Sequence, residues 1–216
     1  MKIESDTATT GPHDFDYSLE NICRTAETVE TPTKLKVNKG QVPEWMNFNW
    51  YRTGPGIFEF GDDEYQNLGD PLAMIQRMKF KNGEVEYQSH LLESVHFKMN
   101  KDANAIVTPE MGTWGEPEWV TNCEDMTEDG TNPCMLEWMT SPDFVSDNAY
   151  VSFFIAGGRL FASGETYHIW EIDPITGHGI RRINLNDLFP ETVFKNNPET
   201  GCETVATHLG KSKIFF

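Results

Sequence analysis

Apolar and polar residues alternate most regularly within residues 148–185, where short runs are separated by breaks at Gly157, Gly158, Gly164 and residues 173–177. The alternation has a period of two residues, which is typical of β-strands that bury one face. Short breaks of this kind connect neighbouring antiparallel strands. The pattern therefore predicts a four-stranded antiparallel meander, which has the size of one propeller blade.

A hairpin is predicted at Asn82 and Gly83, which lie between an apolar run that ends at Phe80 and the alternating residues Val85 and Tyr87. Asn and Gly tolerate positive φ at both central positions of a two-residue turn, so this dipeptide is the strongest short-range hairpin signal. We expect two antiparallel strands on either side of it.

Shorter elements are predicted elsewhere in the first half of the chain. The Gly-Pro-Gly sequence at residues 54–56 predicts a tight turn, followed by a short strand over 57–61. Residues 105–112 predict another short strand. Helical periodicity is limited to residues 71–78. The fold class is therefore all-β.

The chain is divided into two regions by composition. Residues 1–40 are polar and short of large apolar side chains, so we expect a polar lead that is partly ordered at most. Residues 41–216 contain the repeated short strands, and they are long enough to enclose a sizeable core. Repeated meanders favour a partial β-propeller over a sandwich.

The net charge of the chain excludes some classes of binding partner. The sequence has 34 acidic and 17 basic residues and a net charge of −17. Such a surface repels phosphate backbones, so we expect no nucleic-acid partner and weak or no contact with an anionic membrane surface. The start of the chain has no apolar signal segment, and no run approaches the ~20 apolar residues of a membrane span. A cytoplasmic location is the resulting expectation.

The segment 115–143 is acidic, but it also carries an amphipathic patch at residues 134–139 together with Trp119. This patch is either a shallow apolar surface or a buried turn of the core. The four cysteines are scattered and show no CxxC spacing, so neither a zinc site nor a disulfide framework is expected and all four are predicted as free thiols. They are Cys23, Cys123, Cys134 and Cys202.

Three segments together resemble one known family. They are WYRTGPGIFEFG (50–61), MKFKNGEVEYQSHLL (78–92) and ASGETYHIWEIDPITG (162–177). In the same order they resemble the RNGPG-x-F-x-x-G opening, the F-x-F-K-N-G-x-V-x-Y hairpin and the T-E-T-N-x-x-x-x-I-N-P-x-T strand pair of the carotenoid cleavage oxygenases. The resemblance covers residues 43–185 and is nearest to the animal branch, with the β-carotene oxygenases and the retinal-pigment-epithelium isomerohydrolase.

The resemblance implies a seven-bladed β-propeller with Fe²⁺ on its axis, held by four histidines, three of which are oriented by glutamates. Glu165 matches the first of these glutamates, and Thr166 follows it as in the family. The alternative for Glu165 is a solvated acid in a turn. His208, in VATHLG, is the position that resembles the first iron ligand, although the family's following Pro-His is missing. The alternative for His208 is a frayed terminal histidine.

The remaining histidines are weaker ligand candidates. We predict that His90 and His96 lie on the surface near the hairpin, and that His178 belongs to a turn. His168 alternates with apolar residues on one strand face, which favours a packed core histidine over a ligand. His13 lies in the polar lead.

The function implied by the resemblance is oxidative cleavage of a polyene double bond by Fe²⁺ and dioxygen, with an apolar carotenoid or retinoid as substrate. Family members are more than twice as long, so we expect either a fragment or truncated product of a longer enzyme, inactive alone, or a chain that has lost catalysis. One alternative is retinyl-ester isomerohydrolysis on the same fold. The other is a non-catalytic β-domain that binds protein partners.

Overall fold

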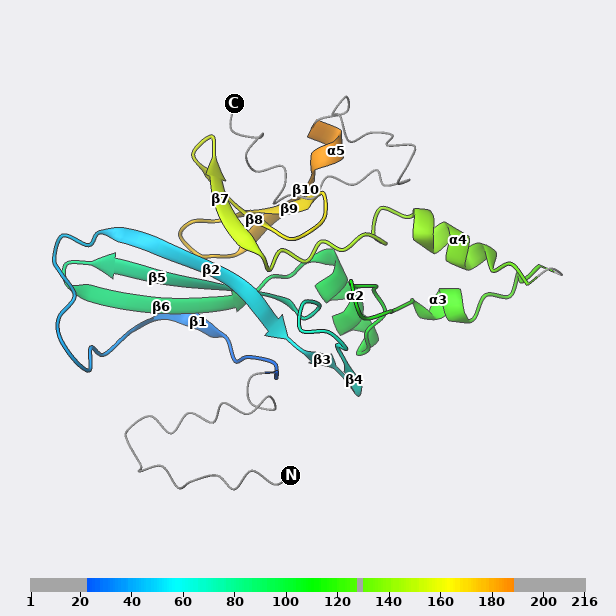
Figure 1. Cartoon of the computed structure of the whole chain (residues 1–216), viewed down its shortest axis with the longest axis horizontal. Helices are drawn as coiled ribbons and strands as arrows, with labels where there is room; N and C mark the ends of the chain where they lie inside the picture. Colours follow the sequence, from blue (N-terminus) through cyan, green and yellow to red (C-terminus); the bar gives the residue numbers. More distant parts are fainter. Residues whose placement is uncertain (1–22, 128–129, 189–216) are drawn as a thin grey trace, which may run out of the picture.

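The computed structural model describes residues 23–127 and 130–188, which form mostly antiparallel β-sheets with few helices (Figure 1). One four-stranded sheet has the order β1-β6-β5-β2, a second has the order β10-β9-β8-β7, and β3 pairs with β4. The strands are β1 (Val29–Lys34), β2 (Phe48–Ile57), β3 (Glu59–Phe60), β4 (Asp63–Glu64), β5 (Leu72–Lys81), β6 (Glu84–Leu91), β7 (Ser152–Ala156), β8 (Arg159–Ser163), β9 (His168–Ile172) and β10 (Gly179–Asn184). The helices are α2 (Val95–Ala103), α3 (Glu118–Thr121), α4 (Pro133–Thr140) and α5 (Leu185–Leu188).

The predicted hairpin is confirmed in the first sheet. β5 and β6 pair with Phe80 opposite Val85, and the two residues of the turn, Asn82 and Gly83, have φ angles of 52° and 77°. Positive φ at both positions gives a turn whose twist matches that of the flanking strands. The edge strand β1 pairs with β6 and lies within the segment 1–40 that was predicted as a polar lead.

The predicted turn at residues 54–56 is wrong, because these residues continue β2. β2 is an edge strand that bonds to β5 on one side only, so Pro55 is tolerated there despite its missing N–H. The pairing register shifts between Pro55 and Ile57. A Cβ atom at Gly56 would lie 2.4 Å from the Cβ of Met74, so glycine is required by the close approach of the two strands.

The helical periodicity noted at residues 71–78 does not correspond to a helix, because residues 72–78 belong to β5. β5 lies between β2 and β6, and its residues 72–75 are all buried. A continuous apolar run of this kind fits a strand that is covered on both faces, and periodicity alone does not separate it from a helix. The strand predicted at 105–112 is absent as well, since that segment is an irregular loop.

Helix α2 was not predicted from the sequence. The hydroxyl of Ser94 accepts a hydrogen bond from the backbone N–H of Phe97 at 3.1 Å, which caps the first turn. The helix ends at Asn104, whose φ of 51° is left-handed. These caps define a nine-residue helix although the segment carries only a weak apolar stripe.

The four-stranded meander predicted for residues 148–185 is confirmed as the second sheet, in which β7, β8, β9 and β10 pair in chain order. Gly157 and Gly158 form the first turn, with φ angles of 55° and 73°. The turn after β9 is closed by the N–H of Gly177, which donates to the carbonyl of Asp173 at 2.8 Å.

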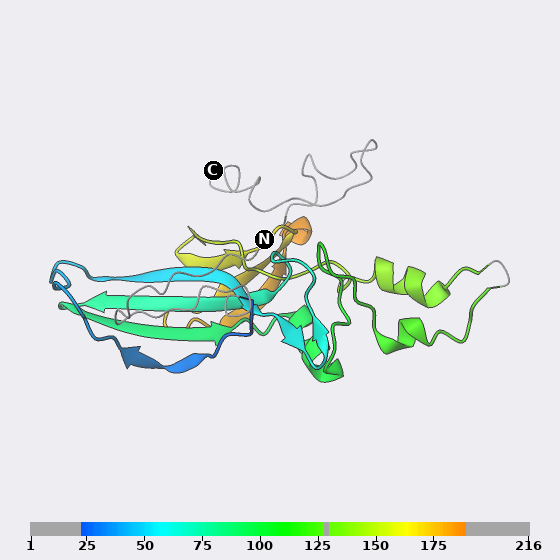
Figure 2. The ribbon, with the colours of Figure 1, turned by 60° about the horizontal axis from the view of Figure 1, so that its bottom comes forward.

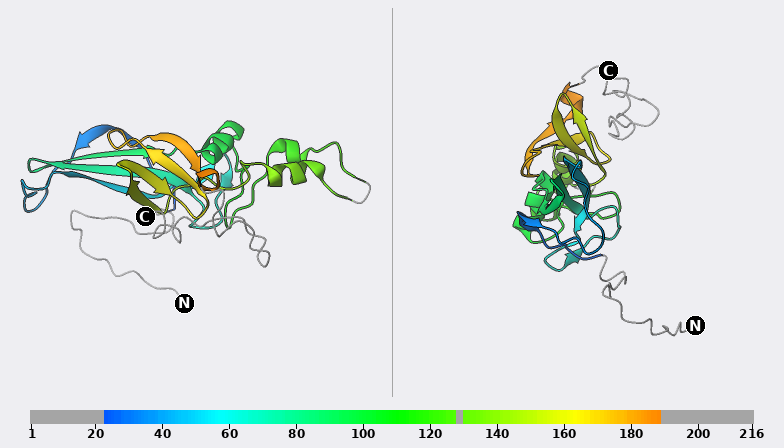
Figure 3. Two further views of the ribbon diagram at one scale, coloured as in Figure 1. Left: turned by 90° about the horizontal axis from the view of Figure 1, so that it is seen from above. Right: turned by 90° about the vertical axis from the view of Figure 1, so that its left-hand side faces the viewer.

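The two sheets pack against each other through a shared core, and Figure 3 shows the second sheet lying alongside the first. Buried residues from both sheets form this core: Ala73, Ile75, Leu92, Ala149, Leu160, Ala162, Trp170 and Ile172. At the contact the hydroxyl of Thr53 donates to the carbonyl of Ala149 at 2.9 Å. Loops that enter and leave this junction form the candidate site described below.

Helices α3 and α4 extend away from the two sheets (Figure 2). The prediction of free thiols is wrong for Cys123 and Cys134, which are joined by a disulfide across a sequence separation of 11 residues. Helices α3 and α4 lie beside each other, which brings the two cysteines together. The spacing of the cysteines in the sequence does not reveal this contact. Cys23 is free, and Cys202 lies outside the described residues.

Both interpretations of the patch at residues 134–139 hold for different side chains. Trp138 is buried, whereas Leu136, Met139 and the neighbouring Trp119 are about half exposed. In the described part of the chain, none of the helices has the length and apolar character that crossing a bilayer requires.

Candidate functional site

A cavity of about 400 Å³ lies where the loops before β5, β7 and β9 meet the loop after α2. Its described lining residues are Gly69, Pro109, Glu110, Met111, Trp114, Phe144, Val145, Ser146, Asn148, Tyr150, Glu165 and Thr166. The wall is largely apolar and aromatic, and it contains two acids, Glu110 and Glu165. An apolar cavity with a few convergent polar groups is the usual form of a small-molecule site.

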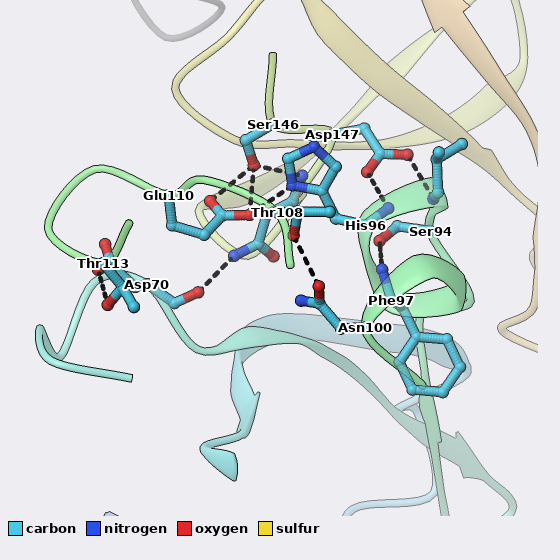
Figure 4. Close-up of polar contacts among 12 residues, drawn as sticks. Asp70, Ser94, His96, Phe97, Asn100, Thr108, Glu110, Thr113, Ser146 and Asp147 are labelled. Atoms are coloured by element: carbon cyan, nitrogen blue, oxygen red, sulfur yellow. Dashed lines mark hydrogen bonds and ion pairs between the residues drawn. The ribbon is translucent and has the colours of Figure 1, made fainter. Parts of the chain in front are cut away.

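One of these acids, Glu110, forms a buried pair with His96 of helix α2 (Figure 4). The Nδ1 atom of His96 lies 2.9 Å from Glu110 Oε1, and its Nε2 atom lies 2.9 Å from the carbonyl oxygen of Asp143. The His96 side chain is fully buried and that of Glu110 is 5% exposed. A ring that donates to acceptors at both nitrogens has no lone pair for a metal ion.

Ser146 links the buried pair to the loop that carries Glu165. Its hydroxyl lies 2.8 Å and 2.7 Å from the two carboxylate oxygens of Glu110. Its carbonyl accepts a hydrogen bond from the hydroxyl of Thr166 at 2.7 Å. A continuous set of polar contacts therefore fixes the position of residues 165–166 relative to helix α2.

Asp147 attaches the same loop to the start of helix α2. Its carboxylate accepts from the backbone N–H groups of Val95 at 2.8 Å and His96 at 3.2 Å. Free N–H groups and the helix dipole favour an anion at this end of a helix. The indole N–H of Trp170 donates to the carbonyl of Asp147 at 3.2 Å, so the core of the second sheet also holds this residue.

Asp70 holds the opposite wall of the cavity. Its fully buried carboxylate accepts from the hydroxyl of Thr113 at 2.6 Å and from the backbone N–H of Gly112 at 3.0 Å (Figure 4). These contacts order the loop that supplies Met111 and Trp114 to the lining. The cavity wall is thus fixed by buried polar groups on both sides.

The electrostatics of the buried pair favour retention of a proton. Burial acts to lower the pKa of His96, but the Glu110 carboxylate, Asp147 and the Asp143 carbonyl outweigh it, so the pKa of His96 lies above its ordinary 6.5. Burial raises the pKa of Glu110 above 4.5, although His96 and Ser146 act in the opposite direction. Since both shifts are upward, the folded chain binds protons at this pair more tightly than the unfolded chain does.

The contributions of His96 and His168 to the free energy of unfolding are together greatest near pH 6.5, while the contribution of Glu110 is lost as the pH rises from 4.5 through its raised folded pKa. The contribution of His96 is fully present below its unfolded pKa of 6.5 and is lost as the pH rises through its raised folded pKa. Burial, with help from Arg182, lowers the pKa of His168, so its contribution is present above 6.5 and is lost as the pH falls. Urea unfolding from about pH 5 to about pH 9 measures the loss of stability on the alkaline side, from His96, and on the acid side, from His168.

The Glu110→Gln variant is the control for this profile. It removes the carboxylate that faces His96, so the fall in stability on the alkaline side becomes shallower, while the acid side set by His168 is retained. An alkaline side that is unchanged in this variant would contradict the assignment to the buried pair.

The structure places Glu165 at the cavity, where it is exposed and lies next to Thr166. His208 lies outside the described residues, so its role as an iron ligand stays a prediction, as does the orienting role of Glu165. None of the described lining residues is a histidine. Among the described residues, the cavity wall therefore contains the carboxylates of Glu110 and Glu165 and no imidazole.

The surface positions predicted for His90 and His96 are wrong, since both side chains are buried. Their partners, Glu30 and Glu110, lie 60 and 14 residues away in the sequence. His168 is confirmed as a packed core histidine, 2% exposed, and His178 as an exposed turn residue.

Sequence reasoning also missed several of the groups that shape the cavity. They are Asp70, Glu110, Ser146 and Asp147. Each is a polar residue in a loop, and no local pattern distinguishes it from a solvated one.

Comparison with known proteins identifies relatives of this chain in sequence. A family model described as retinal pigment epithelial membrane protein matches residues 23–209. The β,β-carotene 15,15′-dioxygenase of Gallus gallus is 31% identical over 191 residues, which is 88% of this chain and 35% of that protein. The carotenoid isomerooxygenase of Galleria mellonella is 32% identical over 175 residues, or 81% of this chain and 33% of that protein. The chain thus spans about a third of the length of these relatives.

Solved structures of related fold agree with this match. A variant of the Synechocystis apocarotenoid oxygenase covers 76% of this chain and 31% of its own, with a TM-score of 0.58 and 19% identity. The cobalt-substituted form of the Synechocystis enzyme covers 73% and 30%, with a TM-score of 0.56 and 19% identity. At this level of sequence identity, these structures show only that this chain shares their fold. Because the family model covers most of the sequence, this chain belongs to the carotenoid oxygenase family that is described as retinal pigment epithelial membrane protein.

Proposed function

We propose that this chain is part of an iron-dependent oxygenase that cleaves a polyene double bond of a carotenoid or retinoid with dioxygen. The observation that carries the proposal is an apolar, aromatic cavity with Glu165 in its wall, at the position that resembles the family's first orienting glutamate. Relatives that are named carotenoid dioxygenases support the substrate class. In this proposal the two sheets are blades of a seven-bladed propeller.

The described residues fit only one part of the iron site. Glu165 has the chemistry of a carboxylate that orients an imidazole and offsets the charge of a ferrous ion. The imidazoles would come from His208 and from chain that lies outside the described residues. Fe²⁺, when bound, would supply the activation of dioxygen that oxidative cleavage requires.

The cavity itself would bind and orient the substrate. Trp114, Phe144 and Tyr150 provide aromatic surface for a conjugated chain, and Met111 provides a deformable contact. The hydrogen bonds at Asp70 and Ser146 keep these walls in place.

Glu165→Gln is expected to lower kcat for polyene cleavage by about 10–100-fold, the usual cost of removing a carboxylate that supports a metal ligand. The amide keeps the size of the side chain but removes its charge, so substrate binding in the cavity should change little. Product formation and iron content are measured on the complete protein that the gene encodes. The matched control is Glu93→Gln, an exposed acid outside the cavity.

The control variant is expected to match the wild type in both measurements. Full activity and full iron content in Glu165→Gln would contradict the role of this acid. An iron-free protein that cleaves no polyene would remove the oxygenase proposal altogether, and a monomeric, cooperatively melting, metal-free chain would then favour a non-catalytic binding domain.

A second candidate is isomerohydrolysis of a retinyl ester. It is the reaction implied by the resemblance to the retinal-pigment-epithelium isomerohydrolase branch of the family. Incubation of the same preparation with β-carotene and with a retinyl ester separates the two reactions, since the first yields aldehydes or ketones and the second yields an isomerised alcohol.

A further inference from the structure

We propose that Glu30, His90 and His178 form a second metal site, for a divalent transition ion such as Zn²⁺, at the junction of the two sheets. One ligand atom from each residue lies within 4.8 Å of the other two. Glu30 belongs to β1, His90 to β6, and His178 to the turn between β9 and β10. None of the three lines the cavity or belongs to the residues proposed for iron.

His90 is the buried centre of this cluster. Its side chain is 3% exposed, and Nδ1 lies 2.5 Å from Glu30 Oε2. Its Nε2 atom is buried and has no hydrogen-bond partner among the described residues. Because Nε2 has no described partner that fixes the tautomer, Nδ1 can present its lone pair on the side of the ring where Glu30 lies. A metal ion accepts the lone pair of a neutral imidazole.

The side chains have the chemistry of a zinc site with an open position. Two imidazoles and one carboxylate are a common three-ligand set, and water completes the tetrahedron. Zinc bonds of about 2.0–2.2 Å place neighbouring ligand atoms roughly 3.5 Å apart. The 2.5 Å gap between His90 Nδ1 and Glu30 Oε2 must open by about 1 Å to admit the ion, while His178 moves toward it. Both Glu30, with a 57% exposed side chain, and the exposed His178 can make these movements.

The turn that carries His178 is built to lie against His90. The carboxylate of Asp173 accepts from the backbone N–H of Ile175 at 2.7 Å, which fixes the turn. Gly177 has a φ of 81°, and a Cβ atom there would lie 3.1 Å from His90 Cδ2. The ring centroids of His90 and His178 are accordingly only 4.0 Å apart.

Contacts with the first sheet hold both sides of the cluster in place. The hydroxyl of Tyr51 donates to the carbonyl of Pro174, and Arg77 donates to the carbonyl of Ile175. On the other side, the amide of Gln88 donates to the backbone carbonyl of Glu30 at 2.7 Å. A bound ion would therefore connect the edge strand β1 to the second sheet at a place where these hydrogen bonds already hold the backbone on both sides.

The test is a Zn²⁺ titration of the metal-free chain in competition with a chromophoric chelator, with the absorption spectrum of Co²⁺ as a second readout. We expect one ion per chain with micromolar or tighter affinity, and a Co²⁺ spectrum of tetrahedral type. His178→Ala and Glu30→Gln are each expected to weaken Zn²⁺ binding by at least about tenfold. Both side chains are exposed, so neither substitution should prevent folding.

Two control variants locate the bound ion. Glu84→Gln removes an acid of matched exposure, 55%, on the same sheet, and is expected to leave binding unchanged. His208→Ala is also expected to retain Zn²⁺ binding, so loss of the proposed iron site and loss of this site are distinguishable. Wild-type affinity in His178→Ala, absence of binding in the wild type, or loss of the ion in His208→Ala would each overturn the proposal.

Discussion

Replacing His96 with alanine is expected to lower the free energy of unfolding by about 3–5 kcal/mol, because it leaves the Glu110 carboxylate buried without its charged partner. The Glu110 side chain is 5% exposed, and Ser146 then remains its only described side-chain donor. A domain of this kind is stable by only about 5–15 kcal/mol, so much of the stability would be lost. Urea unfolding at pH 6.5, followed by tryptophan fluorescence, measures the change.

The double substitution His96→Phe with Glu110→Leu distinguishes loss of the pair from loss of packing. Replacing both members by apolar side chains of similar size removes the buried charge, so it should recover much of the stability lost in His96→Ala. A cost below about 1 kcal/mol for His96→Ala would contradict the buried pair, since it would mean that Glu110 is not an uncompensated charge when His96 is absent.

Two turns of the fold could be predicted from the residue types at their central positions. Asn82 and Gly83 form the expected hairpin, and Gly157 and Gly158 form the first turn of the meander, because positive φ at consecutive positions is a property of these residues themselves. The same reasoning failed at residues 54–56. There the neighbouring strand β5 supplies hydrogen bonds and close packing, which override the local preference for a turn.

The cavity could be predicted only where a residue resembles a family motif, as Glu165 does. The groups that build its walls interact over long distances along the chain: Asp70 bonds to residues 112–113, and His96 to Glu110 and Asp143. A single sequence shows the polarity of such residues but not their partners. Their burial is therefore decided by tertiary packing that no local pattern contains.

The Cys123–Cys134 disulfide was missed for a related reason. The scattered spacing of the cysteines gave no framework, and the two residues meet because α3 and α4 fold back on each other. The buried position of His90 likewise depends on β1 and the β9–β10 turn, which come from opposite ends of the described chain.

Replacing Trp170 with alanine is the other substitution with a large expected effect, a loss of about 3–5 kcal/mol in the free energy of unfolding. Trp170 is 7% exposed and belongs to the core shared by the two sheets, together with Ile75, Leu92 and Ala162. The cavity left by the indole could be filled only by moving one sheet toward the other. Urea unfolding under the conditions used for His96→Ala gives a direct comparison.

Trp170→Phe separates the packing of this residue from its hydrogen bond. Phenylalanine keeps most of the apolar surface but removes the N–H that donates to the carbonyl of Asp147, so a smaller loss of about 1–3 kcal/mol is expected. Asp147 in turn caps helix α2 and precedes the cavity residue Asn148, so both variants should also weaken binding of an apolar ligand in the cavity. If both variants lost the same small amount of free energy of unfolding, the packing of the two sheets would not depend on the Trp170 side chain. That result would contradict the role of this core in positioning the cavity residues.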